Sequence, residues 1–289
     1  MTITKNRPSI LRQYANGNCH IELYADGSKH RSWEGEARPE HPESIDLKIT
    51  DYCDAGCSYC HEKSTKKGLH ADIEVIKGIL AGLPAGVEIA IGGGNPMSHP
   101  SLGQLLKWIA DQGLIANLTI NQGHAFESRQ QVLDWQAQGL LYGVGLSVER
   151  LRCLEFLEFE PANLVYHVIV GVADPQRIIL DSRPEDRILV LGFKRYGFGL
   201  HANESKVTKE IGRWRYWIKP MLKHCNAISF DNLAIKQLGI KDIVKPEVWA
   251  TRYMGDDGQF TMYVDAVRKE YAVSSTSTRK ACESLSIQV

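Results

Sequence analysis

The chain has no excess of either charge, because 34 lysines and arginines balance 34 aspartates and glutamates. This balance removes the global electrostatic argument for a protein of nucleic acid or membrane surfaces, although a local basic patch leaves nucleic acid open as a partner. No apolar run approaches the ~20 residues that a membrane-spanning helix needs. Residues 1–7 also lack the apolar segment of a secretory signal. We therefore expect a cytoplasmic protein without a membrane partner.

Internal repeats and low-complexity sequence are lacking too, apart from a short polar stretch at 274–278. Hydrophobic residues make up 43% of the 289 positions and charged residues 24%, which is ordinary for a globular chain. This length suits one α/β barrel with appendages better than two independent domains.

The chain has seven cysteines, an odd number that cannot all pair within one chain, and three of them lie between residues 53 and 60. The other four are isolated in the sequence: Cys19, Cys153, Cys225 and Cys282. In a chain that lacks an export signal, this distribution indicates a metal site in a reducing compartment and not a disulfide framework.

Short apolar runs alternate with helical patterns from residue 45 onward, which predicts βα units and a parallel sheet. The expected fold class is α/β, a complete or partial (β/α) barrel of about six or seven parallel strands with short N-terminal and C-terminal β-hairpin appendages. The expected strands are 45–50, 87–92, 116–121, 140–147, 164–170, 187–193 and 227–230, and the clearest helices are 72–80, 101–112 and 126–138.

Three regions follow from this pattern: an N-terminal hairpin appendage at 1–44, the partial barrel at 45–230, and a helical and hairpin cap at 231–289. In the appendage, Asp26 and Gly27 predict a two-residue hairpin turn between strands 19–24 and 28–33. In the cap, the alternating run 259–266 pairs with 270–274 as a terminal hairpin, which forms a cap or an edge on the barrel. The chemistry of such a barrel belongs at the carboxyl ends of its strands.

The strongest chemical signal is the run Cys53-Asp-Ala-Gly-Cys57-Ser-Tyr-Cys60 directly after the first barrel strand. Three thiolates from one loop can converge on one centre, and thiolates select zinc or iron–sulfur clusters. A structural zinc site is normally closed by four ligands, and the only nearby fourth candidate is His61. Because His61 is adjacent to Cys60, it closes a tetrahedron awkwardly, which favours the cluster.

This C-x-x-x-C-x-aromatic-C loop resembles the signature of the radical S-adenosylmethionine (SAM) superfamily. The resemblance implies that Cys53, Cys57 and Cys60 hold three irons of a [4Fe–4S] cluster, whose fourth iron binds the amino and carboxylate groups of SAM. It also implies that Tyr59 packs near the adenine. The resemblance covers roughly residues 45–195. Within the family, the sequence is most similar to a branch found in bacteria and phages, and no substrate can be carried over from that branch.

The end of the second strand resembles the family's Gly-Gly-Glu-Pro element, with Asn95 where many members have Glu. The resemblance implies that these glycines let backbone carbonyls approach the SAM ammonium group. Further SAM contacts are implied at the later strand ends. The complete set of implied SAM-binding residues is Tyr59, Gly92, Gly93, Gly94, Asn95, Asn121, Ser147, Glu149, Val170, Gly171, Phe193 and Lys194.

The function implied by the resemblance is reductive cleavage of SAM at the cluster to a 5′-deoxyadenosyl radical, which abstracts hydrogen from a substrate. A nucleotide, a peptide and a small metabolite all stay open as that substrate, and His61, Glu62 and Lys63 are its candidate contacts. We assign no catalytic residue. The expected partner is an external one-electron donor such as flavodoxin or ferredoxin.

The alternative function is a non-catalytic zinc- or cluster-binding regulatory module that contacts nucleic acid through the basic segment 206–223. Against this, Ile211, Trp214, Ile218 and Leu222 recur at helical spacing and predict an amphipathic helix facing a core. Pro220 would kink or end this helix. His167, inside a strand, is interpreted as a packed and hydrogen-bonded core histidine.

Overall fold

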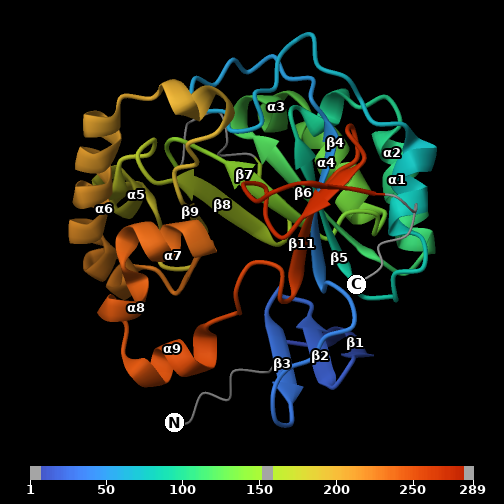
Figure 1. Ribbon diagram of the computed structural model, residues 1–289, viewed down its shortest axis with the longest axis horizontal. Coiled ribbons are helices and arrows are strands. Elements are labelled where there is room, and N and C mark those ends of the chain that lie inside the picture. Colours follow the sequence, from blue (N-terminus) through green and yellow to red (C-terminus); the bar gives the residue numbers. More distant parts are fainter. Residues whose placement is uncertain (1–7, 152–158, 283–289) are drawn as a thin grey trace.

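A large, mostly parallel sheet forms the body of the protein (Figure 1). The structure, a computed structural model, describes residues 8–151 and 159–282. Within these ranges ten strands pair in the order β10-β9-β8-β7-β6-β5-β4-β11-β12-β13. The pairings from β10 to β11 are all parallel. The parallel strands are β4 (Ser44–Thr50), β5 (Glu88–Gly93), β6 (Ile115–Asn121), β7 (Gly143–Ser147), β8 (Leu164–Ile169), β9 (Arg187–Leu191), β10 (Ala227–Phe230) and β11 (Thr261–Asp265).

The prediction of an α/β fold with a parallel sheet is confirmed, but the predicted strand number is too low. β11 belongs to the run assigned to a terminal hairpin, and it inserts in parallel beside β4 (Figure 1). It also forms that hairpin, pairing antiparallel with β12 (Glu270–Ala272), which pairs with β13 (Lys280–Ala281). Among the described residues no pairing joins β10 to β13, so the sheet order is open and a complete barrel is not what the structure shows.

Helices lie around the outer side of the sheet, apart from the last described helix, α9 (Pro246–Arg252), which lies below it beside the N-terminal strands (Figure 1). They are α1 (Ile73–Leu80), α2 (Leu102–Asp111), α3 (Gln122–Glu127), α4 (Arg129–Ala137), α5 (Pro175–Asp181), α6 (Glu204–His224), α7 (Asn232–Leu238), α8 (Ile240–Ile243) and α9 (Pro246–Arg252), with 3₁₀ turns η1 (Pro96–Ser98) and η3 (Gly197–His201). The helices predicted at 72–80 and 101–112 are confirmed. The helix predicted at 126–138 is confirmed as α4 from residue 129 onward, but it begins later than predicted, because the chain leaves helical geometry at Ser128, between α3 and α4.

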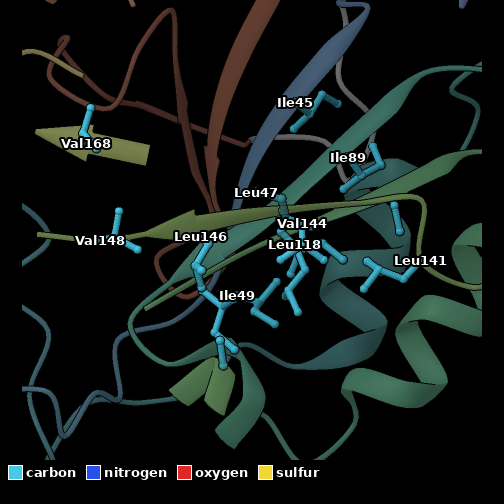
Figure 2. Packing of buried hydrophobic residues seen from close by; sticks show 14 of the residues in the cluster. Ile45, Leu47, Ile49, Ile89, Leu118, Leu141, Val144, Leu146, Val148 and Val168 are labelled. Carbon is cyan, nitrogen blue, oxygen red and sulfur yellow. The ribbon is translucent and has the colours of Figure 1, made fainter. Parts of the chain in front are cut away.

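Strand alternation separates an apolar outer face from a polar inner face. In β4, Ile45, Leu47 and Ile49 are fully buried against the helices, in the cluster that Figure 2 shows. Their sequence neighbours Lys48 and Thr50 therefore lie on the opposite, inner face. The inner face thus carries the polar groups from which a site can be built.

The N-terminal appendage is a three-stranded antiparallel sheet of β1 (Ile10–Asn16), β2 (Cys19–Tyr24) and β3 (Lys29–Trp33). The hairpin is confirmed, but its turn holds three residues, because Gly27 N–H donates to Tyr24 C=O and Tyr24 N–H to Ser28 C=O. Gly27 takes the left-handed conformation of a bulged turn, with φ of 82°. In Figure 1 this sheet lies below the start of β4, at the end opposite the cysteine loop.

Helix α6 continues through Pro220 to His224, so of the two predicted effects of this proline, a kink or an end, the end of the helix is wrong. Trp214, Ile218 and Met221 are fully buried, which confirms the amphipathic helix. No helix in the described ranges combines the length and the apolar character needed to cross a bilayer. Cys153 and the last seven residues of the predicted cap, 283–289, lie outside the described residues.

Candidate metal and cofactor site

The three clustered cysteines lie on the loop that follows β4, at the carboxyl edge of the sheet (Figure 1). All three are half-buried and free. The loop is held by backbone hydrogen bonds from Cys53 N–H to Thr65 C=O (3.0 Å) and from Cys60 N–H to Cys57 C=O (3.2 Å). Gly56 takes a left-handed φ of 67° at the bend, a conformation that glycine adopts without strain.

The three thiols are close enough to interact through their charges. Burial raises the pKa of Cys53, and the charges of Cys60 and Cys57 raise it further. Burial likewise raises the pKa of Cys57, with a further contribution from Cys60. A group of thiols that repel one another when ionised is a favourable donor set for a cation, which relieves the repulsion.

A cavity of about 390 Å³ opens beside this loop, at the carboxyl ends of β6 and β7. It brings together five residues that the sequence predicts for the site: Cys57, Tyr59, Asn121, Ser147 and Glu149. The Tyr59 hydroxyl donates to Glu149 Oε1 at 3.1 Å. Burial, together with the charges of Cys57 and Glu149, raises the pKa of Tyr59, so its phenol keeps the proton that it donates.

His124 is a residue of this cavity that the sequence analysis missed. It lies in α3, three residues after Asn121, and its Nε2 is 2.7 Å from Asp54 Oδ1. Its Nδ1 is buried and has no hydrogen-bond partner among the described residues. One ligand atom each of Cys53, Asp54 and His124 lies within 4.8 Å of the others. A histidine three residues after a strand end, in the first turn of the next helix, was the available signal.

The glycine run at the end of β5 packs against the backbone that leads into the cysteine loop. A Cβ atom on Gly94 would lie 2.1 Å from Tyr52 O, and one on Gly93 would lie 2.5 Å from Thr50 O. Asn95 N–H donates to Tyr52 C=O at 2.6 Å, while the Asn95 side chain accepts from Met97 N–H and caps η1. This close approach of two backbones explains why glycines are needed here. Gly92, Gly93, Gly94 and Asn95 do not line the cavity beside Cys57.

The predicted residues at the ends of β8 and β9 form a separate group. Gly171 lies against the ring of Phe193, and Val170 N–H donates to Leu191 C=O at 2.9 Å. Lys194 Nζ donates to Ser275 Oγ at 2.8 Å, which joins the end of β9 to the polar stretch 274–278. These residues also lie outside the wall of the cavity beside Cys57.

Of the three residues after Cys60, Glu62 makes the most polar contacts through its side chain. Its Oε2 accepts from Lys48 Nζ at 2.8 Å, and its Oε1 accepts from Tyr263 OH at 2.9 Å and lies 3.2 Å from His61 Nε2. Burial would raise the pKa of Glu62, but His61 and Lys48 hold it well below its ordinary value. Burial lowers the pKa of His61. Lys63 has a left-handed φ of 56°.

His167 differs from its interpretation as a hydrogen-bonded core histidine. Its ring lies over Gly145 of β7, where an added Cβ atom would be 2.3 Å from Cε1. Burial lowers its pKa to about 4. Within the described ranges the ring has no hydrogen bond. The ring lies on the inner side of the sheet, and because its pKa is low it is neutral near pH 7.

Comparisons with known proteins bear on the fold. No protein-family model and no curated protein matches the chain. The crystal structure of Streptococcus suis SuiB bound to precursor peptide SuiA superposes with a TM-score of 0.53 at 12% identity, over 84% of this chain and 63% of that chain. SuiB bound to S-adenosylmethionine gives a TM-score of 0.49 at 14% identity, over 84% and 62% of the two chains. This chain thus spans less than two thirds of SuiB, with which it shares the α/β fold.

Proposed function

We propose that the protein is a radical SAM enzyme, in which Cys53, Cys57 and Cys60 hold a [4Fe–4S] cluster and the adjoining cavity binds SAM. The observation that carries the proposal is the convergence of the cysteine loop with the ends of β6 and β7 around one cavity of about 390 Å³. The fold shared with SuiB supports it. The donor chemistry fits as well, because three mutually repelling thiols leave one corner of such a cluster open to a ligand.

When bound, the cluster would supply the electron for cleavage of SAM to a radical that takes hydrogen from the substrate. The chain's own residues bind and orient. Tyr59 and Glu149, joined by their hydrogen bond, form one wall of the cavity, and Ser147 adds a hydroxyl for the ribose or carboxylate of SAM. Asn121 is committed to capping α3, with its oxygen 2.9 Å from Gly123 N–H, which leaves its amide N–H₂ to donate.

We place the remaining predicted contacts further round the same edge. Gly92 to Asn95 would border the amino group of SAM, and Val170, Gly171, Phe193 and Lys194 would flank its adenine. His61, Glu62 and Lys63 stay candidates for substrate contact. Because SuiB was crystallised with a precursor peptide, a peptide is the first substrate class to screen. The proposal includes a cytoplasmic location and an external electron donor such as flavodoxin or ferredoxin. It also keeps the division of the chain into an N-terminal appendage, a partial barrel and a C-terminal cap, with boundaries at residues 44 and 230.

The decisive experiment is anaerobic reconstitution with iron and sulfide, followed by addition of SAM and a strong reductant. We expect about four irons per chain and formation of 5′-deoxyadenosine. Peptides, nucleotides and small metabolites would then be compared for stimulation of that product. A reconstituted chain that holds four irons but neither binds nor cleaves SAM would contradict the proposal.

A zinc-binding module is the second candidate, favoured by the proximity of Cys53, Asp54 and His124. The proposed contact of this module with nucleic acid is less well supported, because the apolar residues of segment 206–223 in α6 are buried in the core. Substitution separates the two candidates. His124→Ala should leave the iron content unchanged if the three cysteines hold a cluster, whereas it should abolish one-to-one zinc binding if His124 is a ligand.

A further inference from the structure

A buried lysine lies behind the cysteine loop. Lys48, on the inner face of β4, has only 2% of its side chain exposed. Its Nζ lies 2.5 Å from Asp51 Oδ1, 2.8 Å from Glu62 Oε2 and 3.1 Å from Asp265 Oδ2. A buried ammonium group is stable only where such partners replace its water. Two of these partners, Asp51 and Glu62, flank the cysteine loop on either side.

The third partner comes from the far end of the sequence. Asp265 is fully buried at the end of β11, where it pairs in register with Lys48. Tyr263, two residues earlier on the same face of β11, donates to Glu62 Oε1. Strand β11 therefore contacts Lys48 directly and Glu62 through a second hydrogen bond, although about 200 residues separate them along the chain.

Two arginines complete this network of Lys48, its three carboxylates and Tyr263. Arg279 NH1 is 3.3 Å from Asp265 Oδ2, and its guanidinium lies 4.4 Å from the centre of the Tyr263 ring. Arg268 NH2 is 3.9 Å from Asp51 Oδ2. Among the residues that the structure describes, no arginine forms an ion pair with Glu62, so Lys48 supplies the cation and Tyr263 the hydroxyl that hold it, with His61 beside it.

We propose that Lys48, Tyr263 and Asp265 are positioning residues for the metal centre. They fix Glu62, two residues after Cys60, and so order the cysteine loop before any metal binds. The inference rests on the proposed function for the identity of the metal centre, but the ordering of the loop is a property of the metal-free chain. A loop that is already ordered loses less conformational entropy when the centre assembles, so assembly is more favourable.

The test measures amide hydrogen exchange of the metal-free protein, residue by residue, in wild type and variants. Lys48→Met leaves three carboxylates without their shared cation, and we expect amides between residues 51 and 63 to exchange about tenfold faster or more. Tyr263→Phe removes one oxygen atom and should speed exchange of the same amides about threefold. Amides of β7 and α6 should keep their wild-type rates in both variants.

Lys107→Met is the matched control, since Lys107 belongs to an exposed ion pair with Asp111 on α2. It should change no exchange rate in the loop. In parallel, iron bound after reconstitution should fall to less than about half in Lys48→Met and stay unchanged in Lys107→Met. If Lys48→Met does not fold, Tyr263→Phe decides.

Unchanged loop exchange in Tyr263→Phe would overturn the proposal, and so would faster exchange spread equally over β7 and α6, which indicates a general loss of stability. Failure of the proposed function gives a different result. If wild type takes up no iron, the cluster assignment is wrong, while the exchange measurements still decide whether β11 orders the loop.

Discussion

Substitution of Gly94 by alanine tests the close approach of β5 to the cysteine loop. The added Cβ would lie 2.1 Å from Tyr52 O, whereas Cβ atoms in proteins essentially never come within 3.0 Å of such a neighbour. The carbonyl cannot yield freely, because it accepts the 2.6 Å hydrogen bond from Asn95 N–H. One of the two backbones must therefore move by about 1 Å, and overpacking of this kind costs about 1–3 kcal/mol.

Because Tyr52 immediately precedes Cys53, the displacement reaches the loop. We expect thermal unfolding of metal-free Gly94→Ala to begin roughly 2–8 °C lower than in wild type, and less iron to be retained after reconstitution. Gly212→Ala is the matched control, since Gly212 lies inside α6 with no atom within 4 Å of its added Cβ. Alanine there should stabilise the helix by about 0.5–1 kcal/mol. Wild-type melting and iron content in Gly94→Ala would refute this reasoning.

Three further predictions concern the metal site, the core and pH. Cys57→Ala should abolish cluster assembly yet keep the circular dichroism of wild type, while Cys282→Ala keeps its iron; equal iron content in the two variants would refute the ligand assignment. Trp214→Ala should lower the free energy of unfolding by about 3–5 kcal/mol, because Trp214 is fully buried and donates to Ala173 C=O, whereas exposed Tyr216→Ala should change it by less than about 0.5 kcal/mol. His167 has a folded pKa of about 4, below its unfolded value of ~6.5, so the unfolded chain binds more protons between these pH values and stability falls as pH drops from ~6.5 towards 4. His167→Gln should flatten that dependence by up to about 3 kcal/mol in denaturant titrations, and an unaltered slope would show that the pKa of His167 is the same in the folded and unfolded chains.

The seven predicted barrel strands all exist, with ends that differ by up to three residues, because each is a short apolar run between turn residues. The largest difference concerns 140–147, where β7 begins at Gly143. The eighth parallel strand was not predicted as such. Alternation between Met262 and Val264 on one side and Tyr263 and Asp265 on the other fits an exposed hairpin equally well, and only pairing with β4 buries both faces.

The cysteine loop could be predicted because its information is local, in spacing and in position after the first strand. His124 could not, since a single histidine after a strand end has many ordinary explanations, and its contact with Asp54 spans 70 positions. The glycine run shows a third case. Its position was predicted, but its close contact with Tyr52 and Thr50 is a property of packed backbones that residue types alone do not reveal.

The polar groups of β4 and β11 show why a local motif needs distant support. Lys48 and Asp265 both break the expectation that interior strand positions are apolar, and each alone would destabilise the sheet. In register on neighbouring parallel strands they neutralise each other, and the surplus negative charge of Asp51 and Glu62 is drawn to the same ammonium group. The pair therefore offsets the cost that either buried charge would have alone, and it anchors both ends of the cysteine loop at once. It follows that substitutions in β11 should be felt at the loop more strongly than substitutions of equal size in β10, at the other end of the parallel strands.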